Sequence, residues 1–236
     1  GALGIHAGAV GTSGAAVLAA RAGAASGAGT VTVMCRDDAW QAIASSLSAQ
    51  MVRPASAGPG RQFTAVLAGP GWGMDAEAAA VLAELLVSDL PLVLDADALR
   101  LLASDTINPE RPSAAPLVLT PHPGEFTGLV LRSTGKEQGL LDIPAILGTC
   151  ASFFNAVVVL KNHVTWIAAP DGRLAVWDGQ EPALGTGGSG DVLAGLVAGL
   201  MARGCSAFDA ACAGVIAHGD RKSVVYGKSV DIGGRP

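Results

Sequence analysis

The sequence predicts an α/β protein, a three-layer α/β/α sandwich whose central sheet is mostly parallel. Two observations lead to this class. Short aliphatic runs alternate along the chain with longer Ala- and Leu-rich segments, the pattern of strands and helices that form a sheet covered on both faces. The chain has 236 residues, half of them hydrophobic, which suits one packed core and excludes a disordered or collagen-like chain.

Several helices have clear local signals. The segments with helical composition or spacing are residues 14–29, 75–87, 143–154, 191–203 and 207–218. The first of them ends in the helix stop Ser26-Gly27-Ala28-Gly29, and Asp75 opens the second. After the predicted strand at residues 116–120, Pro121 and Pro123 exclude a helix before Glu125.

The strands are short apolar runs bounded by turn residues. They are residues 30–34, 63–68, 92–95, 116–120, 156–161, 165–169 and 173–177. The last two flank Pro170-Asp171-Gly172, which predicts a hairpin. We interpret residues 55–61 as a flexible surface loop rather than a domain boundary, because the strand and helix pattern resumes directly after it.

Ligands of parallel sheets bind at the carboxyl ends of the strands. We therefore expect the loops after Ala68, Leu94, Thr120 and Leu160 to converge with the loop before Asp191 on one cleft.

The most informative segment is that loop, Gly185-Thr186-Gly187-Gly188-Ser189-Gly190, followed by Asp191 and an apolar helix. Glycines let successive backbone N–H groups turn toward one anion, and the helix N-terminus adds a positive field, so the loop is suited to hold a phosphate. It lacks the Lys-Ser/Thr of a Walker loop and the βαβ context of a dinucleotide fingerprint.

Asp191 has two interpretations. It is either a helix cap or the base that takes a proton from a substrate hydroxyl as that oxygen attacks a phosphoryl group. The glycine loop before it favours the base.

Residues 185–191 resemble the glycine-rich loop and catalytic Asp of the ribokinase-like superfamily. Four other segments, with this loop, resemble one family in it, the ADP- or ATP-dependent NAD(P)H-hydrate dehydratases. They are residues 14–33 with Gly14-Ala15-Ala16, Gly69-Pro70-Gly71, residues 93–99 with Asp95-Ala96-Asp97, and residues 119–126 with Pro121-His122-Pro123-Gly124-Glu125. The resemblance spans residues 8–219.

The resemblance implies repair of NADH hydrate and NADPH hydrate, coenzymes that have gained water at ring carbon 6. ADP or ATP, with Mg²⁺, would phosphorylate the hydroxyl, and loss of phosphate would restore the coenzyme. Asp191 would deprotonate the hydroxyl, while the amides of Gly187, Gly188 and Gly190 would stabilise the phosphoryl charge.

Other site residues are carried over by position. Ala15, Gly71, His122 and Asp191 match positions that contact the hydrate. The positions that match the nucleotide site are Lys161, Asn162, His163, Val164, Thr165 and the loop residues Gly185, Thr186, Gly187, Gly188, Ser189 and Gly190. The family usually has Lys-Gly where this chain has Lys161-Asn162, which weakens the assignment of residues 161–165.

Four of these polar residues have simpler alternatives. His122 is either a substrate contact or a turn histidine bonded to backbone, and for Glu125 we favour a helix N-terminal charge over a water-mediated Mg²⁺ ligand. Asp95 and Asp97 either face the cleft together, to position magnesium or water, or Asp97 caps a helix that begins at Ala98. We interpret the four tryptophans as core or loop packing residues rather than as a platform on which a ligand stacks.

The ends of the chain depart from the family. The family's first strand and the His-Lys-Gly segment before it are not visible ahead of Gly1, so we expect truncation there. Residues 220–236 resemble a translated DNA-sequencing adapter, and we interpret them as a non-native tail behind a single domain of residues 1–219.

The composition of the chain excludes some classes of binding partner. The net charge of −5, without a basic cluster before the last residues, argues against nucleic acid and anionic membranes. Cys35, Cys150, Cys205 and Cys212 form no Cys-x-x-Cys pair, so we expect reduced thiols, no zinc site and a cytoplasmic protein. A homo-oligomer is compatible with the family. The alternatives are a vitamin kinase for hydroxymethylpyrimidine or hydroxyethylthiazole, and a nucleotide-binding module without turnover.

Overall fold

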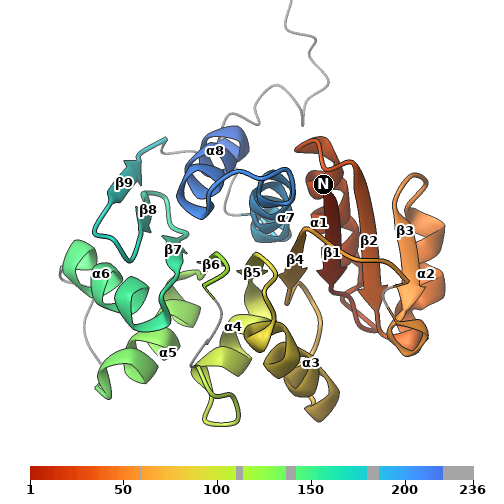
Figure 1. Ribbon diagram of the computed structural model, residues 1–236, viewed down its shortest axis with the longest axis horizontal. Coiled ribbons are helices and arrows are strands. Elements are labelled where there is room, and N and C mark those ends of the chain that lie inside the picture. Colours follow the sequence, from red (N-terminus) through yellow and green to blue (C-terminus); the bar gives the residue numbers. More distant parts are fainter. Residues whose placement is uncertain (59, 110–113, 137–141, 180–185, 220–236) are drawn as a thin grey trace, which may run out of the picture.

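The computed structural model describes residues 1–58, 60–109, 114–136, 142–179 and 186–219. These residues form one nine-stranded sheet in the order β3-β2-β1-β4-β5-β6-β7-β8-β9 (Figure 1). The strands are β1 (Ala2–His6), β2 (Thr30–Cys35), β3 (Met51–Pro54), β4 (Ala65–Ala68), β5 (Leu92–Leu94), β6 (Leu117–Leu119), β7 (Val157–Leu160), β8 (Thr165–Ala168) and β9 (Leu174–Trp177). Strands β1 to β7 pair in parallel, and β8 pairs antiparallel with both β7 and β9. The predicted sheet and the hairpin at Pro170-Asp171-Gly172 are confirmed.

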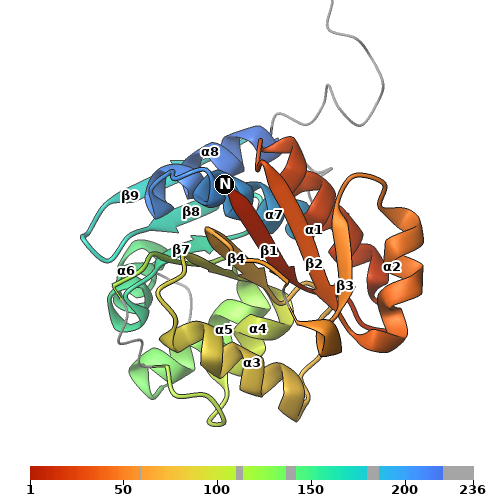
Figure 2. The same ribbon diagram turned by 45° about the vertical axis from the view of Figure 1, so that its right-hand side comes forward.

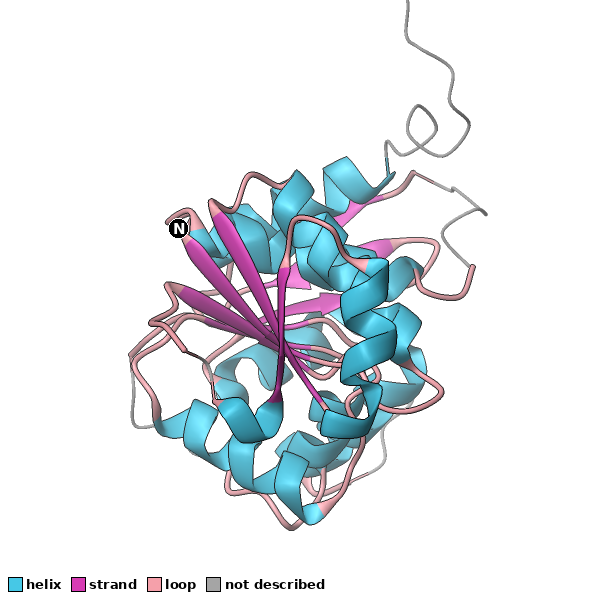
Figure 3. Cartoon of the chain, turned by 90° about the vertical axis from the view of Figure 1, so that its right-hand side faces the viewer, coloured by secondary structure: helices cyan, strands magenta, loops and turns pink. Residues whose placement is uncertain are grey.

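Helices cover both faces of this sheet, which confirms the three layers. They are α1 (Ser13–Ala25), α2 (Trp40–Ser46), α3 (Ala76–Val87), α4 (Ala96–Ala103), α5 (Pro123–Thr134), α6 (Ile143–Phe154), α7 (Ser189–Ala202) and α8 (Ala207–Gly219). Helices α3 to α6 lie on one side of the sheet and α1, α2, α7 and α8 on the other (Figure 2). Figure 3 shows the strands fanning between the two groups.

Alternation along the strands builds two cores. Ala65 and Leu67 of β4 point into the core with α1 and α7, whereas Val66 and Ala68 point into the core with α3 and α4. A strand that is apolar at every position is therefore buried on both faces, as expected for a parallel sheet.

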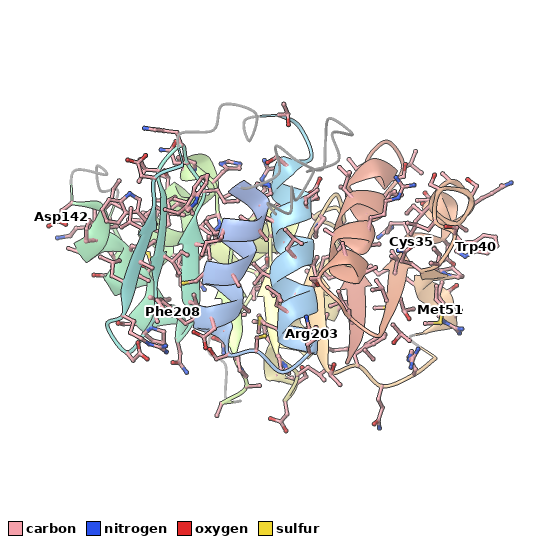
Figure 4. All side chains as sticks on the ribbon, turned by 90° about the horizontal axis from the view of Figure 1, so that it is seen from above. Cys35, Trp40, Met51, Asp142, Arg203 and Phe208 are labelled. Atoms are coloured by element: carbon pink, nitrogen blue, oxygen red, sulfur yellow. The ribbon has the colours of Figure 1, made fainter. Side chains whose placement is uncertain are left out.

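Small residues bring α1 and α7 unusually close. A Cβ atom on Gly195 would lie 2.3 Å from the backbone oxygen of Ala19, and one on Gly199 would lie 2.6 Å from that of Gly23. Helices α1, α7 and α8 accordingly run side by side over the sheet (Figure 4). This packing sets the position of the N-terminus of α7.

The sequence analysis missed three elements in the first sixty residues. Strand β1 (Ala2–His6) was not predicted, yet it is an interior strand that pairs with β2 and β4. Its Gly4 packs against Phe63, and a glycine at this position hides the strand pattern. Helix α2 and strand β3 were also not predicted, since Trp40–Ser46 is short and Met51–Pro54 is a partly exposed edge strand.

The segment predicted as a flexible loop has local structure. Ala55–Ala57 forms a turn of 3₁₀ helix, and the Arg53 guanidinium donates hydrogen bonds to the carbonyls of Gly58 (2.8 Å) and Ala57 (3.0 Å). Across the part of the chain that the structure describes, none of the helices has the length and apolar character to span a membrane.

Candidate active site

The predicted convergence of loops at the carboxyl ends of the strands is confirmed by direct contacts. The N–H of Gly69, after β4, donates to the carbonyl of His6, at the end of β1 (3.0 Å). The N–H of Lys161, after β7, donates to the carbonyl of Pro121, after β6 (2.8 Å). The Lys161 side chain crosses to Asp95, after β5. One edge of the sheet therefore brings together residues from the ends of five strands, β1, β4, β5, β6 and β7.

The N-terminus of α7 opens onto this edge. Gly188 is the residue before the helix, in the left-handed conformation (φ 84°), and within the described residues no side-chain hydrogen bond caps the first turn. The first N–H groups of a helix lack partners within it. The N–H of Ser189 donates to the carbonyl of Thr186 (3.2 Å), and the other amides of the turn suit an anion, as the glycine loop predicts. Gly185 lies outside the described residues, whereas Thr186 and Gly187 are exposed at the start of this turn.

Gly188 has a steric reason to be glycine. A Cβ atom there would lie 2.4 Å from the Leu18 side chain and 3.8 Å from Oδ2 of Asp191. A side chain would have to displace the end of the Leu18 side chain, and at φ 84° the backbone itself is strained for any residue but glycine. Beside it, Ser189 is buried, and its Oγ lies 3.0 Å from Nε2 of His218 on α8. This contact anchors the first turn to the neighbouring helix.

Asp191 is the third residue of α7 and does not cap it, because the helix begins at Ser189 behind Gly188. The structural alternative for Asp191 is therefore wrong. Burial, and then the nearby carboxylate of Asp95, raise the pKa of Asp191 to about 6, while Lys161 acts in the opposite direction. A carboxylate with a pKa this close to neutrality has the basicity that a general base needs.

A buried ion pair lies under this helix turn. Nζ of Lys161 is 2.6 Å from Oδ1 of Asp95, and the two side chains are 18% and 2% exposed. The hydroxyl of Thr120 donates to the same Oδ1 (2.9 Å). A Cβ on Gly190 would lie 3.1 Å from Nζ of Lys161, so the ammonium touches the first turn of α7.

The predicted nucleotide residues 161–165 form the tight connection from β7 to β8. The Asn162 carboxamide oxygen accepts from the N–H of His163 (2.8 Å), and the Thr165 hydroxyl donates to the carbonyl of Asn162 (3.2 Å). Asn162 and His163 are exposed, Val164 is half-buried and Thr165 is buried. Only part of this set therefore faces outward, and the Lys161 head is already paired with Asp95.

Asp95 and Asp97 each have a protein partner, Lys161 for Asp95 and a backbone amide for Asp97. Helix α4 begins at Ala96, so Asp97 lies inside its first turn rather than capping a helix at Ala98. Oδ2 of Asp97 accepts from the N–H of Gly73 (2.9 Å) and ties the loop after β4 to α4. Within the described residues, no group of three or more His, Cys, Asp or Glu side chains is arranged to hold a metal ion.

His122 and Glu125 form a capping box on α5. Nδ1 of His122 accepts from the N–H groups of Gly124 (3.0 Å) and Glu125 (3.3 Å), and Oε2 of Glu125 accepts from the N–H of His122 (2.9 Å). The alternatives of a backbone-bonded His122 and a helix-terminal Glu125 are confirmed. The imidazole is still 50% exposed, with Nε2 3.2 Å from Oε1 of Glu125, so it keeps a free face at the edge of the sheet.

Ala15 and Gly71 lie on the two sides of Thr12. The Thr12 hydroxyl donates to the carbonyl of Gly71 (2.8 Å), and the N–H of Ala15 donates to the carbonyl of Thr12 (3.1 Å). Gly71 has φ 53°, and a Cβ there would lie 2.7 Å from that of Thr12. The structure brings these two predicted substrate positions together.

The sequence analysis gave no role to His6 or Arg36. They line a hollow of about 110 Å³ with Trp72, whose ring centre is 5.6 Å from that of His6. Burial lowers the pKa of His6 to about 4. Arg36 makes ion pairs with Asp75 (2.7 Å) and Glu77 (3.1 Å). A histidine at the end of a strand would have been the signal, but the strand itself was missed.

Comparisons with known proteins agree with this geometry. A family model described as NAD(P)H-hydrate dehydratase matches residues 3–227, which extends past Gly219. The ADP-dependent (S)-NAD(P)H-hydrate dehydratase of Neisseria meningitidis is 38% identical over 95% of this chain and 77% of its own length. The bifunctional NAD(P)H-hydrate repair enzyme Nnr of Salinibacter ruber is 36% identical over 85% of this chain, which spans only 39% of that protein.

A solved structure is also similar. The ADP/ATP-dependent NAD(P)H-hydrate dehydratase of Bacillus subtilis, co-crystallised with ATP and Mg²⁺ and soaked with CoA, superposes with a TM-score of 0.79. It is 28% identical, over 92% of this chain and 80% of that one. The open helix turn, the half-buried Asp191 and these matches give one conclusion: the chain belongs to the NAD(P)H-hydrate dehydratase family.

Proposed function

We propose that this chain dehydrates the hydrates of NADH and NADPH, with ADP or ATP as phosphoryl donor, and so repairs reduced nicotinamide coenzymes. The observation that carries the proposal is the uncapped first turn of α7 with Asp191 inside it, beside the Lys161 ammonium. The names of the Neisseria and Bacillus relatives support the substrate and the donor.

The residues suggest a division of roles. Asp191 accepts the proton of the ring hydroxyl while the hydroxyl oxygen forms a bond to the terminal phosphorus and the nucleotide leaves. The amides of Gly188 and Gly190 face the charge on the transferred group. Phosphate then leaves the ring carbon with the bonding pair, and a proton lost from the adjacent carbon restores the double bond. Hydroxide would leave far less easily than phosphate.

Ala15, Gly71 and His122 are proposed to contact the hydrate, and Asn162, His163 and the turn Thr186-Gly187 the nucleotide. The described carboxylates are largely occupied, by Lys161 for Asp95 and by the Gly73 amide for Asp97. Mg²⁺ generally keeps few protein ligands and binds through substrate phosphates. The residues therefore fit an ion that arrives on the nucleotide, where it would neutralise phosphate charge. A cytoplasmic homo-oligomer is part of the same proposal.

The direct test is a spectrophotometric assay. Purified protein is mixed with NADH hydrate and Mg²⁺, with ADP, with ATP or with neither, and recovery of reduced nicotinamide absorbance is followed. We expect recovery that requires a nucleotide, with ADP at least. NADH itself serves as the standard for full recovery. No recovery with either nucleotide, from folded protein, would exclude the proposal.

A further inference from the structure

The buried pair of Asp95 and Lys161 needs an explanation beyond stability. Removing two charges from water costs several kcal/mol, and a well-packed apolar pair is often as stable or more so. The side chains are 2% and 18% exposed, with 2.6 Å between Oδ1 and Nζ. The charges therefore suggest a task that apolar residues could not perform.

The pair is held rigidly from three strands. Asp95 follows β5, and its Oδ1 also accepts the hydroxyl proton of Thr120, which follows β6 and is fully buried. Lys161 follows β7, with its N–H bonded to the carbonyl of Pro121 (2.8 Å). The ammonium is thereby pressed against Gly190, 3.1 Å from where a Cβ would stand. Lysine alone is flexible, so the carboxylate is what aims it at α7.

Asp191 is surrounded mainly by negative charge. The groups that act on its ionisation come from four elements: Asp95 after β5, Asp97 in α4, Glu125 in α5 and Lys161 after β7. Three are carboxylates that oppose ionisation of Asp191, and Lys161 is the cation that favours it. Without a fixed cation here, burial and three like charges would keep a base protonated.

We propose that Asp95 and Lys161 are positioning residues for Asp191: Asp95, with Thr120, holds the Lys161 ammonium against the first turn of α7, where its charge keeps the Asp191 carboxylate ready to accept the hydroxyl proton. This inference rests on the proposed function. It differs from the sequence prediction that Lys161 only binds the nucleotide, because it links Lys161 to the protonation of Asp191.

The two partners should shift Asp191 in opposite directions. Lys161→Met removes the favourable charge, so the acidic limb of the kcat/KM profile should move up by about one pH unit. Asp95→Asn removes the charge that opposes ionisation of Asp191 most strongly, and this outweighs the weaker hold on the ammonium, so the limb should move down by a similar amount. The double variant Asp95→Asn/Lys161→Gln loses both opposing charges, so its acidic limb should lie near that of the parent protein.

Matched controls are Lys136→Met and Asp38→Asn, exposed residues that are not among the charges acting on Asp191, and they should leave the limb in place. A ¹³C NMR titration of the Asp191 carboxyl, assigned by its loss in Asp191→Asn, measures the same shifts without substrate. It therefore decides the inference even if the parent fails to dehydrate the hydrate, or if Lys161→Met is too unstable for kinetics. The inference would be overturned if these variants raised the KM for the nucleotide but left both the acidic limb and the Asp191 titration in place. It would also be overturned if Lys161→Met and Asp95→Asn shifted the Asp191 titration in the same direction.

Discussion

Two ionisable residues, Asp191 and His6, lie at the same carboxyl edge of the sheet but in different settings. Burial moves both toward their neutral forms, raising the pKa of Asp191 to about 6 and lowering that of His6 to about 4. Asp191 stands at a helix N-terminus among charges from four elements, whereas burial is the one cause acting on His6, which lies beside Trp72.

The difference shows what makes a buried group reactive. Burial alone gives His6 a pKa far below neutrality, so its imidazole stays neutral near pH 7. At Asp191 burial is again the largest cause, but charges act beside it, with Asp95 raising and Lys161 lowering the pKa of the carboxyl. The chemistry is therefore located where charges gather at the end of α7 rather than where an ionisable side chain is merely enclosed.

The largest effect should follow from Asp191→Asn. Loss of the base should lower kcat by about 10³-fold, with nucleotide affinity unchanged because the first-turn amides remain. Parallel assays of turnover and of ADP binding by calorimetry check both. A fully active variant would remove Asp191 from the chemistry, and loss of nucleotide binding would make its role structural.

The same substitution should stabilise the fold at high pH. A carboxyl whose pKa is raised in the folded state favours folding while protonated, and this contribution is lost as the pH rises from about 4 through 6. Asn removes the cost of the buried charge, so Asp191→Asn should gain on the order of 1 kcal/mol at pH 8 and little at pH 4. Denaturant unfolding of the parent protein and of Asp191→Asn at pH 4 and at pH 8 measures this difference in the free energy of unfolding.

His6 should affect stability in the opposite pH direction. Its pKa is lowered in the folded state, so stability is complete above pH 6.5 and declines as the pH falls toward 4. We expect a loss of about 2 kcal/mol between pH 7 and pH 5 from this residue. His6→Gln should flatten that part of the curve and leave kcat at pH 7 unchanged, and an unaltered curve would show that His6 is not enclosed as described.

The smallest effect concerns the capping box of α5. Glu125→Ala removes the acceptor for the His122 amide and should cost about 1 kcal/mol of stability. Glu125→Gln, which keeps an acceptor oxygen, is the matched control. If the His122 ring contacts the hydrate, Glu125→Ala should also raise the KM for the hydrate, whereas Glu125→Gln should not. Equal KM values for the two variants would limit His122 and Glu125 to a structural role.

Much of the fold was predictable because its signals are local. The strand-helix alternation and the hairpin turn at residues 170–172 depend on neighbours in sequence, and both are confirmed. The expectation that no helix begins before Glu125 is wrong, because α5 begins at Pro123, and the first position of a helix tolerates a proline since its N–H has no partner there. Strand β1 was not predicted because Gly4 and His6 interrupt its apolar pattern. Its strand conformation depends on pairing with β2 and β4.

The sequence by itself determined the three-layer class, the open helix turn and the carboxylate at its start, since glycine conformation and helix ends are properties of a few consecutive residues. The tertiary structure alone decided that Lys161 turns to Asp95, that Asp97 binds the Gly73 amide and that Asp191 carries a raised pKa. The physical reason is that electrostatic energies depend on distance and burial in space, and residues 66 positions apart meet only when the sheet brings their strands together.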